Sequence, residues 1–331
     1  MLSGGRSSER DVSLTSARSV SAALDPARYQ VREIEIGADG RWQLPRSAEA
    51  RELGDGSALP IPAENGVQPF SDVDVVFPVL HGPFGEDGTV QGLLELAGIA
   101  YVGAGVTASA LCMDKDLFKS VMRDKGIPVA RSVTARSKDE RSVESPFGYP
   151  CVVKPARLGS SVGISIVHEP NELAAAAELA FRHDEKILVE EFLDGVEVEC
   201  SVLGNEEPIA SLPGEIVPLA SDWYDYEAKY AAGGMELVVP PRISEESARR
   251  VQELAVASFV AADCEGMARV DFFVRPGGEV VVNELNTIPG FTATSVYSKL
   301  FEASGISYPE LLDRLVTLAL ERRERRSRLL F

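Results

Sequence analysis

The sequence lacks long apolar runs and an apolar leader, and each absence excludes a class of protein. No run approaches the roughly 20 apolar residues that a membrane-spanning helix needs, and the start, MLSGGRSSERDVS, has no apolar centre of the kind found in signal peptides. Cysteine is scarce, with four widely separated residues in 331 and no metal-binding spacing, so reduced, partly buried thiols are expected. We therefore expect a cytoplasmic protein with no membrane partner.

Basic charge is also scarce. The chain has 33 lysines and arginines against 51 aspartates and glutamates, for a net charge of −18. This balance excludes the general basic surface by which proteins bind nucleic acid. An anionic nucleotide can still bind where lysines, arginines, backbone amides and a metal ion are concentrated locally. The one basic cluster, ERRERRSR at residues 321–328, is predicted to be the solvated end of a last helix rather than a binding arm.

The order of strand-like and helix-like segments divides the chain into three regions: residues 1–103, 104–195 and 196–331. The first region alternates strands and helices, which is typical of a small parallel α/β domain. Its segments GGRSSE and HGPFGEDG follow strands, which is where such sheets bind ligands. Helices are predicted near residues 12–24, 88–99, 113–125, 171–181 and 245–262, with a last one from residue 308.

A hairpin is predicted at residues 269–286, which read RVDFFVRPGGEVVVNELN. Asp271 lies before the PGG turn, while Glu284 and Asn286 lie two residues apart after it. Alternate residues of a strand share a face, so the hairpin gathers three oxygen ligands of the kind that Mg²⁺ prefers. A solvated edge hairpin is the alternative, but both carboxylates lie inside apolar runs, where an unpaired charge would be costly.

A strand that ends at Lys154 is followed by the glycine-containing loop RLGSSVG and then by a second strand. Backbone N–H groups of such a loop, with the lysine beside them, can bind phosphate oxygens. By itself the pattern is equally typical of a plain hairpin, but with a magnesium hairpin downstream it predicts a nucleotide site. The stretch KILVEEFLDGVEVE fits a strand that binds the nucleotide base, or else an acidic edge strand. GAGVTA at residues 103–108 lacks the context of a dinucleotide fingerprint.

Taken together, Lys154, the GSSVG loop, VEEFL and the 269–286 hairpin resemble the motifs of ATP-grasp enzymes. Further motifs narrow the resemblance to the D-alanine–D-alanine ligase family: GGRSSERDVS, HGPFGEDGTVQG, YDYEAKY and NELNTIPGFTATS. The resemblance covers essentially the whole chain. It implies an α/β ATP-grasp fold, in which an N-terminal domain is followed by two subdomains that sandwich ATP, here residues 104–195 and 196–331.

The resemblance also implies which residues would bind the two substrates and the oxyanion. Glu9 would hold the ammonium group of the first D-alanine, and Ser160 and Tyr230 would complete a hydrogen-bonded trio with it. The other members of this set are His81 by the first carboxylate, Arg269 and the N–H of Gly290 at the oxyanion, and Ser295 at the second carboxylate.

For ATP and metal, the resemblance implies a second set of residues. Those at the phosphates are Lys115, Lys154, Ser161 and Lys229; those at adenine are Glu190, Glu191 and Leu193; and Glu197 is at the ribose. Asp271, Glu284 and Asn286 would hold two Mg²⁺ or Mn²⁺ ions. The implied reaction joins two D-alanines through an acyl phosphate, for peptidoglycan precursor synthesis, in a homodimer.

Two points bear on this interpretation. Tyr230 in EAKY favours the dipeptide product, because related ligases that make D-alanyl-D-lactate carry a histidine in that loop. Other ATP-grasp carboxylate–amine ligases, including the D-alanine–D-lactate type, and a non-catalytic nucleotide-binding relative are the alternatives.

The chain also departs from the family at its start, since most of the first strand is missing before Gly4. Unpaired backbone groups and a poorly placed Glu9 are the expected consequences.

Overall fold

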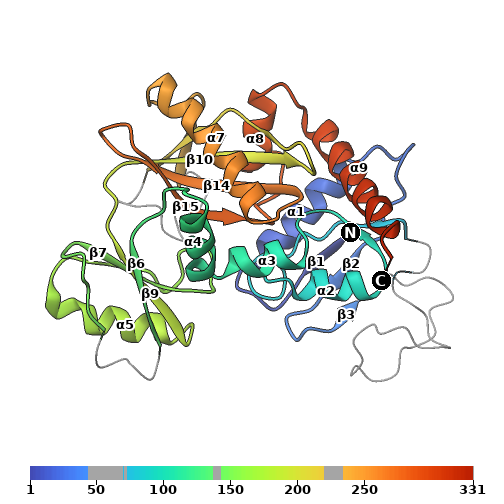
Figure 1. The fold of residues 1–331 in the computed structure, drawn as a ribbon. Helices are drawn as coiled ribbons and strands as arrows, with labels where there is room; N and C mark the ends of the chain where they lie inside the picture. The colour runs from blue at the N-terminus through green and yellow to red at the C-terminus, as the bar shows by residue number, and fades with distance from the viewer. Residues whose placement is uncertain (44–69, 71–72, 137–142, 220–233, 331) are drawn as a thin grey trace.

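The computed structural model describes residues 1–43, 70, 73–136, 143–219 and 234–330. An N-terminal sheet region, a central four-stranded sheet and a C-terminal six-stranded sheet follow one another along the chain (Figure 1). Helix α5 and the central sheet lie at the end of the molecule away from α9. The fold is therefore mixed α/β, as the sequence predicts.

The N-terminal region is a mostly parallel sheet whose first strand is short but paired on both sides. Its strands are β1 (Leu2–Gly4), β2 (Ile34–Ile36), β3 (Trp42–Gln43), β4 (Val75–Val76) and β5 (Ala100–Tyr101). β1 pairs in parallel with β2, and on its other side the N–H of Leu2 donates to Phe77 at 2.9 Å. Leu2 is fully buried. The backbone of this strand is thus satisfied, contrary to the expectation of unpaired groups.

The central sheet is antiparallel and carries the glycine-containing loop. Its strands are β6 (Ser132–Arg136), β7 (Cys151–Pro155), β8 (Ser165–Val167) and β9 (Lys186–Glu191), in the order β6-β9-β7-β8. Helix α5 (Leu173–Phe181) buries its alanine-rich face against β7, β8 and β9. The loop joins two antiparallel neighbours, so the predicted strand–loop–strand arrangement is confirmed.

The C-terminal sheet is antiparallel and contains the longest strands. They are β10 (Val196–Gly204), β11 (Ile209–Ala210), β12 (Gly214–Pro218), β13 (Met235–Val238), β14 (Gly266–Val274) and β15 (Val280–Asn286). One core cluster joins β10, β14 and β15 to α7 (Glu245–Ala261) and to two helices from the middle of the chain. A second cluster, rich in aromatic side chains, joins α8 (Val296–Ala303) and α9 (Tyr308–Ser327) to α1 (Arg10–Ala23).

The helix predicted near residues 113–125 is preceded by another helix that the sequence did not indicate. These are α3 (Val106–Met113) and α4 (Lys115–Asp124), separated by Asp114. Asp114 caps α4, since its Oδ1 accepts a hydrogen bond from the N–H of Leu117 at 3.2 Å. The same oxygen lies 2.6 Å from Nζ of Lys186 at the start of β9, which ties α4 to the central sheet. Helix α2 (Thr89–Leu96) covers the N-terminal sheet.

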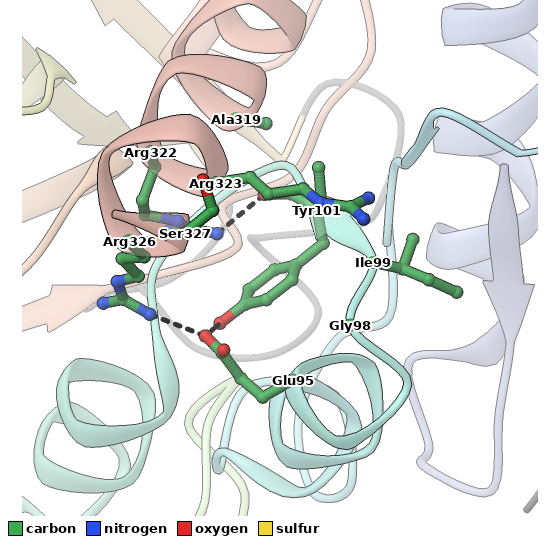
Figure 2. A pocket seen from close by; sticks show the side chains of 10 residues that line it. Glu95, Gly98, Ile99, Tyr101, Ala319, Arg322, Arg323, Arg326 and Ser327 are labelled. Carbon is green, nitrogen blue, oxygen red and sulfur yellow. Dashed lines mark hydrogen bonds and ion pairs between the residues drawn. The ribbon is translucent and has the colours of Figure 1, made fainter. Parts of the chain in front are cut away.

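The basic end of α9 is not simply solvated, so that prediction was wrong for part of the cluster. Arg322 is 3% exposed, lies 4.3 Å from the ring centroid of Tyr101 and donates to the main-chain oxygens of Tyr101 and Gly103. Arg326 forms an ion pair with Glu95 at 2.6 Å (Figure 2). A pocket of about 270 Å³ lies beside these contacts. Arg322 and Arg326 therefore anchor α9 to β5 and α2.

Two further expectations can be compared with the structure. All four cysteines are free thiols, and all four are buried rather than partly buried. Burial raises the pKa of Cys200 to about 12, so this thiol stays protonated and inert. Among the described residues, no helix combines the length and apolar character that crossing a membrane requires.

Candidate active site

The predicted hairpin forms, and its register places acidic side chains in a row across the C-terminal sheet. Asp271 on β14 pairs with Glu284 on β15 and, on its other side, with Glu199 on β10. Two residues away, Arg269 pairs with Asn286. A β-bulge follows Asp271 and locally increases the twist of the strand. The hairpin thus brings the three predicted metal ligands together at one end.

Arg269 balances the charge of this row. Its guanidinium lies 2.7 Å from each oxygen of Asp271, and its Nε lies 2.8 Å from Oε2 of Glu199. The side chains of Glu199 and Asp271 are 1% and 3% exposed, and Arg269 contacts both carboxylates, which offsets part of the cost of burying their charge. Asn286 donates a hydrogen bond to Asp271 at 2.9 Å. The sequence motifs did not single out Glu199, although it also lies inside an apolar strand.

Two predicted phosphate lysines approach the site from different elements. Lys154, near the end of β7, places its Nζ 2.7 Å from Oε2 of Glu190 on β9. Lys115, the first residue of α4, donates to the main-chain oxygen of Leu158 at 2.7 Å. Its Nζ also lies 3.3 Å from Oε2 of Glu284. Lys115 therefore links the glycine-containing loop to the hairpin.

A third lysine, Lys119, belongs to the same site and was missed by motif reasoning. Its Nζ lies 3.4 Å from Oε1 of Glu190 and 3.3 Å from the main-chain oxygen of Asn283. Burial alone would raise the pKa of Glu190, but the charges of Lys119 and Lys154 hold it below its ordinary value. The signal that could have identified Lys119 is its place in the i, i+3, i+4, i+7 stripe that α4 buries.

The strand predicted to bind the base runs beside this cluster. Glu190, at its end, directs its carboxylate inward to the lysines. The carboxylate of Glu191 instead accepts from the N–H and the guanidinium of Arg131, each at 2.8 Å. Leu193 is 9% exposed and lies in a small apolar cluster. Glu197 lies on β10 and is half-buried.

Glu9 lies against the glycine-containing loop. The hydroxyl of Ser160 donates to Oε1 of Glu9 at 2.5 Å, and Glu9 is 7% exposed. Ser160 and Ser161 have φ angles of 55° and 58°, in the left-handed region that non-glycine residues rarely adopt. The short first strand thus still places Glu9 beside the loop. Tyr230 and Lys229 lie outside the described residues.

His81 and Glu86 lie in the segment HGPFGEDG (residues 81–88), which follows strand β4. His81 Nδ1 lies 3.0 Å from the main-chain oxygen of Ile288, and burial lowers the pKa of its imidazole. Its buried Nε2 has no hydrogen-bond partner among the described residues. Glu86, which the motifs did not single out, accepts from the N–H groups of Gly82 at 2.7 Å and Ile288 at 3.2 Å. Burial, and then the nearby Glu9, raise the pKa of Glu86 to about 8.

Gly290 and Ser295 lie in the segment that joins β15 to α8. Ser295 is the N-cap residue of α8, and its hydroxyl accepts from the N–H of Thr292 at 3.0 Å. A Cβ added to Gly290 would lie 3.4 Å from that hydroxyl, so the two predicted residues are neighbours. Phe291, between them, is fully buried and holds the segment in the core.

The donor set on the hairpin fits a hard cation by its chemistry. Asp271 and Glu284 are direct partners across β14 and β15, and the amide of Asn286 contacts Asp271. Carboxylate and amide oxygens suit Mg²⁺. In the part of the chain that the structure describes, no three His, Cys, Asp or Glu side chains are grouped as a metal site, so the amide is needed to complete the set. A small cavity of about 20 Å³ borders Lys115, Glu284 and Asn286.

Two antiparallel sheets therefore bring lysines and carboxylates to one site, with a glycine-containing loop beside it. This arrangement is that of an ATP-grasp enzyme. The family model described as D-ala D-ala ligase N-terminus matches residues 1–104, and that described as D-ala D-ala ligase C-terminus matches residues 121–317. The chain belongs to the D-alanine–D-alanine ligase family.

Similar proteins cover nearly the whole chain. A D-alanine–D-alanine ligase of Thermoanaerobacter sp. (strain X514) is 46% identical over 344 residues, with 97% of this chain and 96% of that protein covered. The solved structure of the D-alanine–D-alanine ligase from Coxiella burnetii has a TM-score of 0.81 and 37% identity, covering 98% of this chain and 94% of that chain. The VanG D-Ala:D-Ser ligase of Enterococcus faecalis has a TM-score of 0.81 and 38% identity, covering 96% and 98%. The expected ATP-grasp fold is confirmed.

Proposed function

We propose that the protein joins two D-alanines into D-alanyl-D-alanine with conversion of ATP to ADP and phosphate, for peptidoglycan precursor synthesis. The observation that carries this proposal is the hydrogen bond from Ser160 to Glu9. It holds an acid that can bind an ammonium group against a loop that can bind phosphate. An enzyme that phosphorylates the carboxylate of an amino acid needs both groups in one place.

The first D-alanine is a zwitterion, so it needs an anion and a polar partner. Glu9 binds its ammonium group, and His81 lies by its carboxylate. The lowered pKa of His81 keeps this imidazole neutral at physiological pH, so it can donate or accept a hydrogen bond without adding charge. The family resemblance assigns Tyr230 to the same hydrogen-bonded group as Glu9 and Ser160.

ATP lies between the two antiparallel sheets. Lys115, Lys154, Ser161 and Lys229 hold its phosphates. Glu190, Glu191 and Leu193 line the adenine, and Glu197 accepts from the ribose hydroxyls. This assignment is supported by the two lysines that reach the site from α4 and β7. Residues 104–195 and 196–331 act as the two halves of the nucleotide site.

Asp271, Glu284 and Asn286 would hold Mg²⁺ or Mn²⁺, two ions per site. A divalent ion held there would neutralise phosphate charge. The chain's own residues do the rest, because phosphoryl transfer depends mainly on positioning and charge. A carboxylate oxygen of the first D-alanine attacks the γ-phosphorus, the bond to the β-phosphate oxygen breaks, and ADP leaves.

The second step forms the peptide bond. The amine of the second D-alanine, held by Ser295 at its carboxylate, attacks the acyl phosphate carbonyl. Arg269 and the N–H of Gly290 stabilise the oxyanion, the amine loses a proton, and inorganic phosphate leaves. The guanidinium of Arg269 is already held by Glu199 and Asp271, so it costs little reorganisation at the moment of reaction.

The test is ADP release from Mg²⁺-ATP with D-alanine or L-alanine, together with identification of the product. D-alanine-dependent ADP release with formation of the dipeptide is expected, and chelation by EDTA should abolish it. ATP binding without turnover would instead support a non-catalytic relative.

A second candidate is a D-alanine–D-serine ligase. It is favoured by the similarity to the VanG D-Ala:D-Ser ligase, whose TM-score of 0.81 equals that of the Coxiella burnetii enzyme. D-serine and D-lactate are therefore offered as the second substrate in the same assay. The D-alanine–D-alanine assignment requires D-alanyl-D-alanine to be the main product and the mixed product to be the minor one. Sedimentation analysis tests the proposed homodimer, and cell fractionation tests the proposed cytoplasmic location.

A further inference from the structure

Lys119 is a buried lysine at the centre of the proposed phosphate site. Helix α4 buries one stripe, which contains Lys115, Phe118, Lys119 and Met122. The side chain of Lys119 is 0% exposed. Lysine is almost never fully buried unless it is paired. The groups that balance the positive charge of Lys119 therefore have to be identified.

The contacts of Lys119 join several elements at one carboxylate. Its Nζ lies 3.4 Å from Oε1 of Glu190 on β9, and the other oxygen of that carboxylate lies 2.7 Å from Nζ of Lys154 on β7. Both lysines also reach Asn283 on β15. Lys119 is 3.3 Å from its main-chain oxygen, and Lys154 is 3.5 Å from its side-chain oxygen. Two cations thus share one anion between the two sheets.

The charges of this cluster do not cancel. Lys119 and Lys154 contribute +2 and Glu190 contributes −1, so the sum is +1, and the three side chains are 0%, 6% and 5% exposed. The neighbouring pair of Lys115 and Glu284 adds no net charge. An uncompensated charge is strongly unfavourable in a buried site. Burial accordingly lowers the pKa of Lys119 to about 8, although Glu190 opposes the shift. A phosphate group at Lys154 would complete the charge balance.

We propose that Lys119 is a positioning residue for the nucleotide phosphates, which acts by sharing the carboxylate of Glu190 with Lys154. Without Lys119, Glu190 and Lys154 would form a closed neutral pair at 2.7 Å. A phosphate would then have to compete with the carboxylate for Lys154. With Lys119 present, the carboxylate is divided between two cations and Lys154 keeps net charge for the phosphate. The inference rests on the proposed nucleotide-dependent function.

The experiment measures the affinities of the full-length protein for ATP, ADP and adenosine by calorimetry. The variants are Lys119→Met, which keeps the length of the side chain, and the double variant Lys119→Met/Glu190→Gln. Lys125→Met is the matched control, because Lys125 follows the same helix and its side chain is 58% exposed. Adenosine has no phosphate, so it reports on the base and ribose contacts alone.

Lys119→Met is expected to weaken the affinities for ATP and ADP at least about tenfold, given the strength of a buried charge interaction. The affinity for adenosine should change less than about twofold, and the affinities of the Lys125→Met control should match those of the wild type. The double variant retains Lys154 alone and so has the wild-type sum of +1. Because Glu190 is also a proposed adenine residue, the double variant is expected to recover the ratio of ATP affinity to adenosine affinity to within about threefold of the wild type.

Three results would overturn the proposal. They are unchanged ATP affinity in Lys119→Met, equal weakening of all three ligands, and failure of the double variant to recover. If Lys119→Met does not fold, the double variant decides alone, since a folded double variant that loses tenfold or more of its ATP affinity relative to its adenosine affinity contradicts the charge argument. D-alanine is absent from these measurements. A wild type that binds ATP but makes no dipeptide would therefore refute the proposed ligase activity separately.

Discussion

Replacing Arg269 by alanine is expected to reduce both stability and turnover, because one guanidinium serves two buried carboxylates. Arg269 contacts Asp271 through two nitrogens at 2.7 Å and Glu199 at 2.8 Å. The side chains of these carboxylates are 3% and 1% exposed. Without the arginine, two negative charges would face each other on adjacent strands with little access to water.

The magnitudes follow from this geometry. Breaking a buried ion pair by removing one partner typically costs about 3–5 kcal/mol. Since Arg269 neutralises two carboxylates, we expect the free energy of unfolding to fall by the upper part of that range. Loss of a donor at the proposed oxyanion should reduce turnover by a further factor of about 10²–10³.

Two further variants separate the effects. Arg269→Lys keeps the charge but not the paired N–H groups, so it should recover much of the stability and little of the turnover. Arg269→Ala/Glu199→Gln also removes the charge of one of the two carboxylates that Arg269 contacts, so it should also recover stability while remaining inactive. Urea unfolding followed by circular dichroism measures the free energy of unfolding, and D-alanine-dependent ADP release measures turnover. A folded Arg269→Ala protein with turnover within about threefold of the wild type would refute the reasoning.

Ser160→Ala removes the hydrogen bond that holds Glu9, so the KM for D-alanine should rise about tenfold while the Kd for ATP is unchanged; a rise in the Kd for ATP alone would contradict this. Arg322→Ala leaves two buried main-chain oxygens unpaired and should lower the free energy of unfolding by about 2–4 kcal/mol, whereas the exposed Arg328→Ala should change it by less than about 0.5 kcal/mol. The pKa of Glu86 rises from 4.5 to about 8, so the folded protein keeps a proton that the unfolded chain releases. Its stabilisation is present below about pH 4.5 and is lost as the pH rises to about 8, and Glu86→Gln should flatten that decline in unfolding experiments; an unchanged slope would show that Glu86 is not responsible.

Much of the fold could be predicted because its signals are local. The helix at residues 245–262 appears as α7, which Ser244 caps by accepting from the N–H of Ser247. The hairpin at residues 269–286 follows from alternation and the PGG turn. Alternation also placed Asp271, Glu284 and Asn286 on one face, because the period of a strand is a property of the backbone.

The first strand and helix α3 could not be predicted in the same way. β1 has only three residues, and neighbouring segments supply its hydrogen bonds. Helix α3 begins at Val106, in a stretch that resembles a dinucleotide-binding loop, and its buried residues pack against β10, β14 and β15. Propensity is a weak guide where tertiary contacts decide.

The sequence by itself determined the types of residue, their spacing along each strand and the family to which the chain belongs. It determined that Lys154 ends a strand before a glycine-containing loop, and that two acids lie inside apolar runs of a hairpin. Only the tertiary structure decided which charges neutralise one another. Lys119 and Glu190 are 71 positions apart (190 − 119) and Arg269 and Glu199 are 70 apart (269 − 199), yet each pair is in contact. Burial also depends on the packed fold. Breaking these ion pairs is costly because they are buried, whereas the same pairs on the surface would be screened by water and would contribute little.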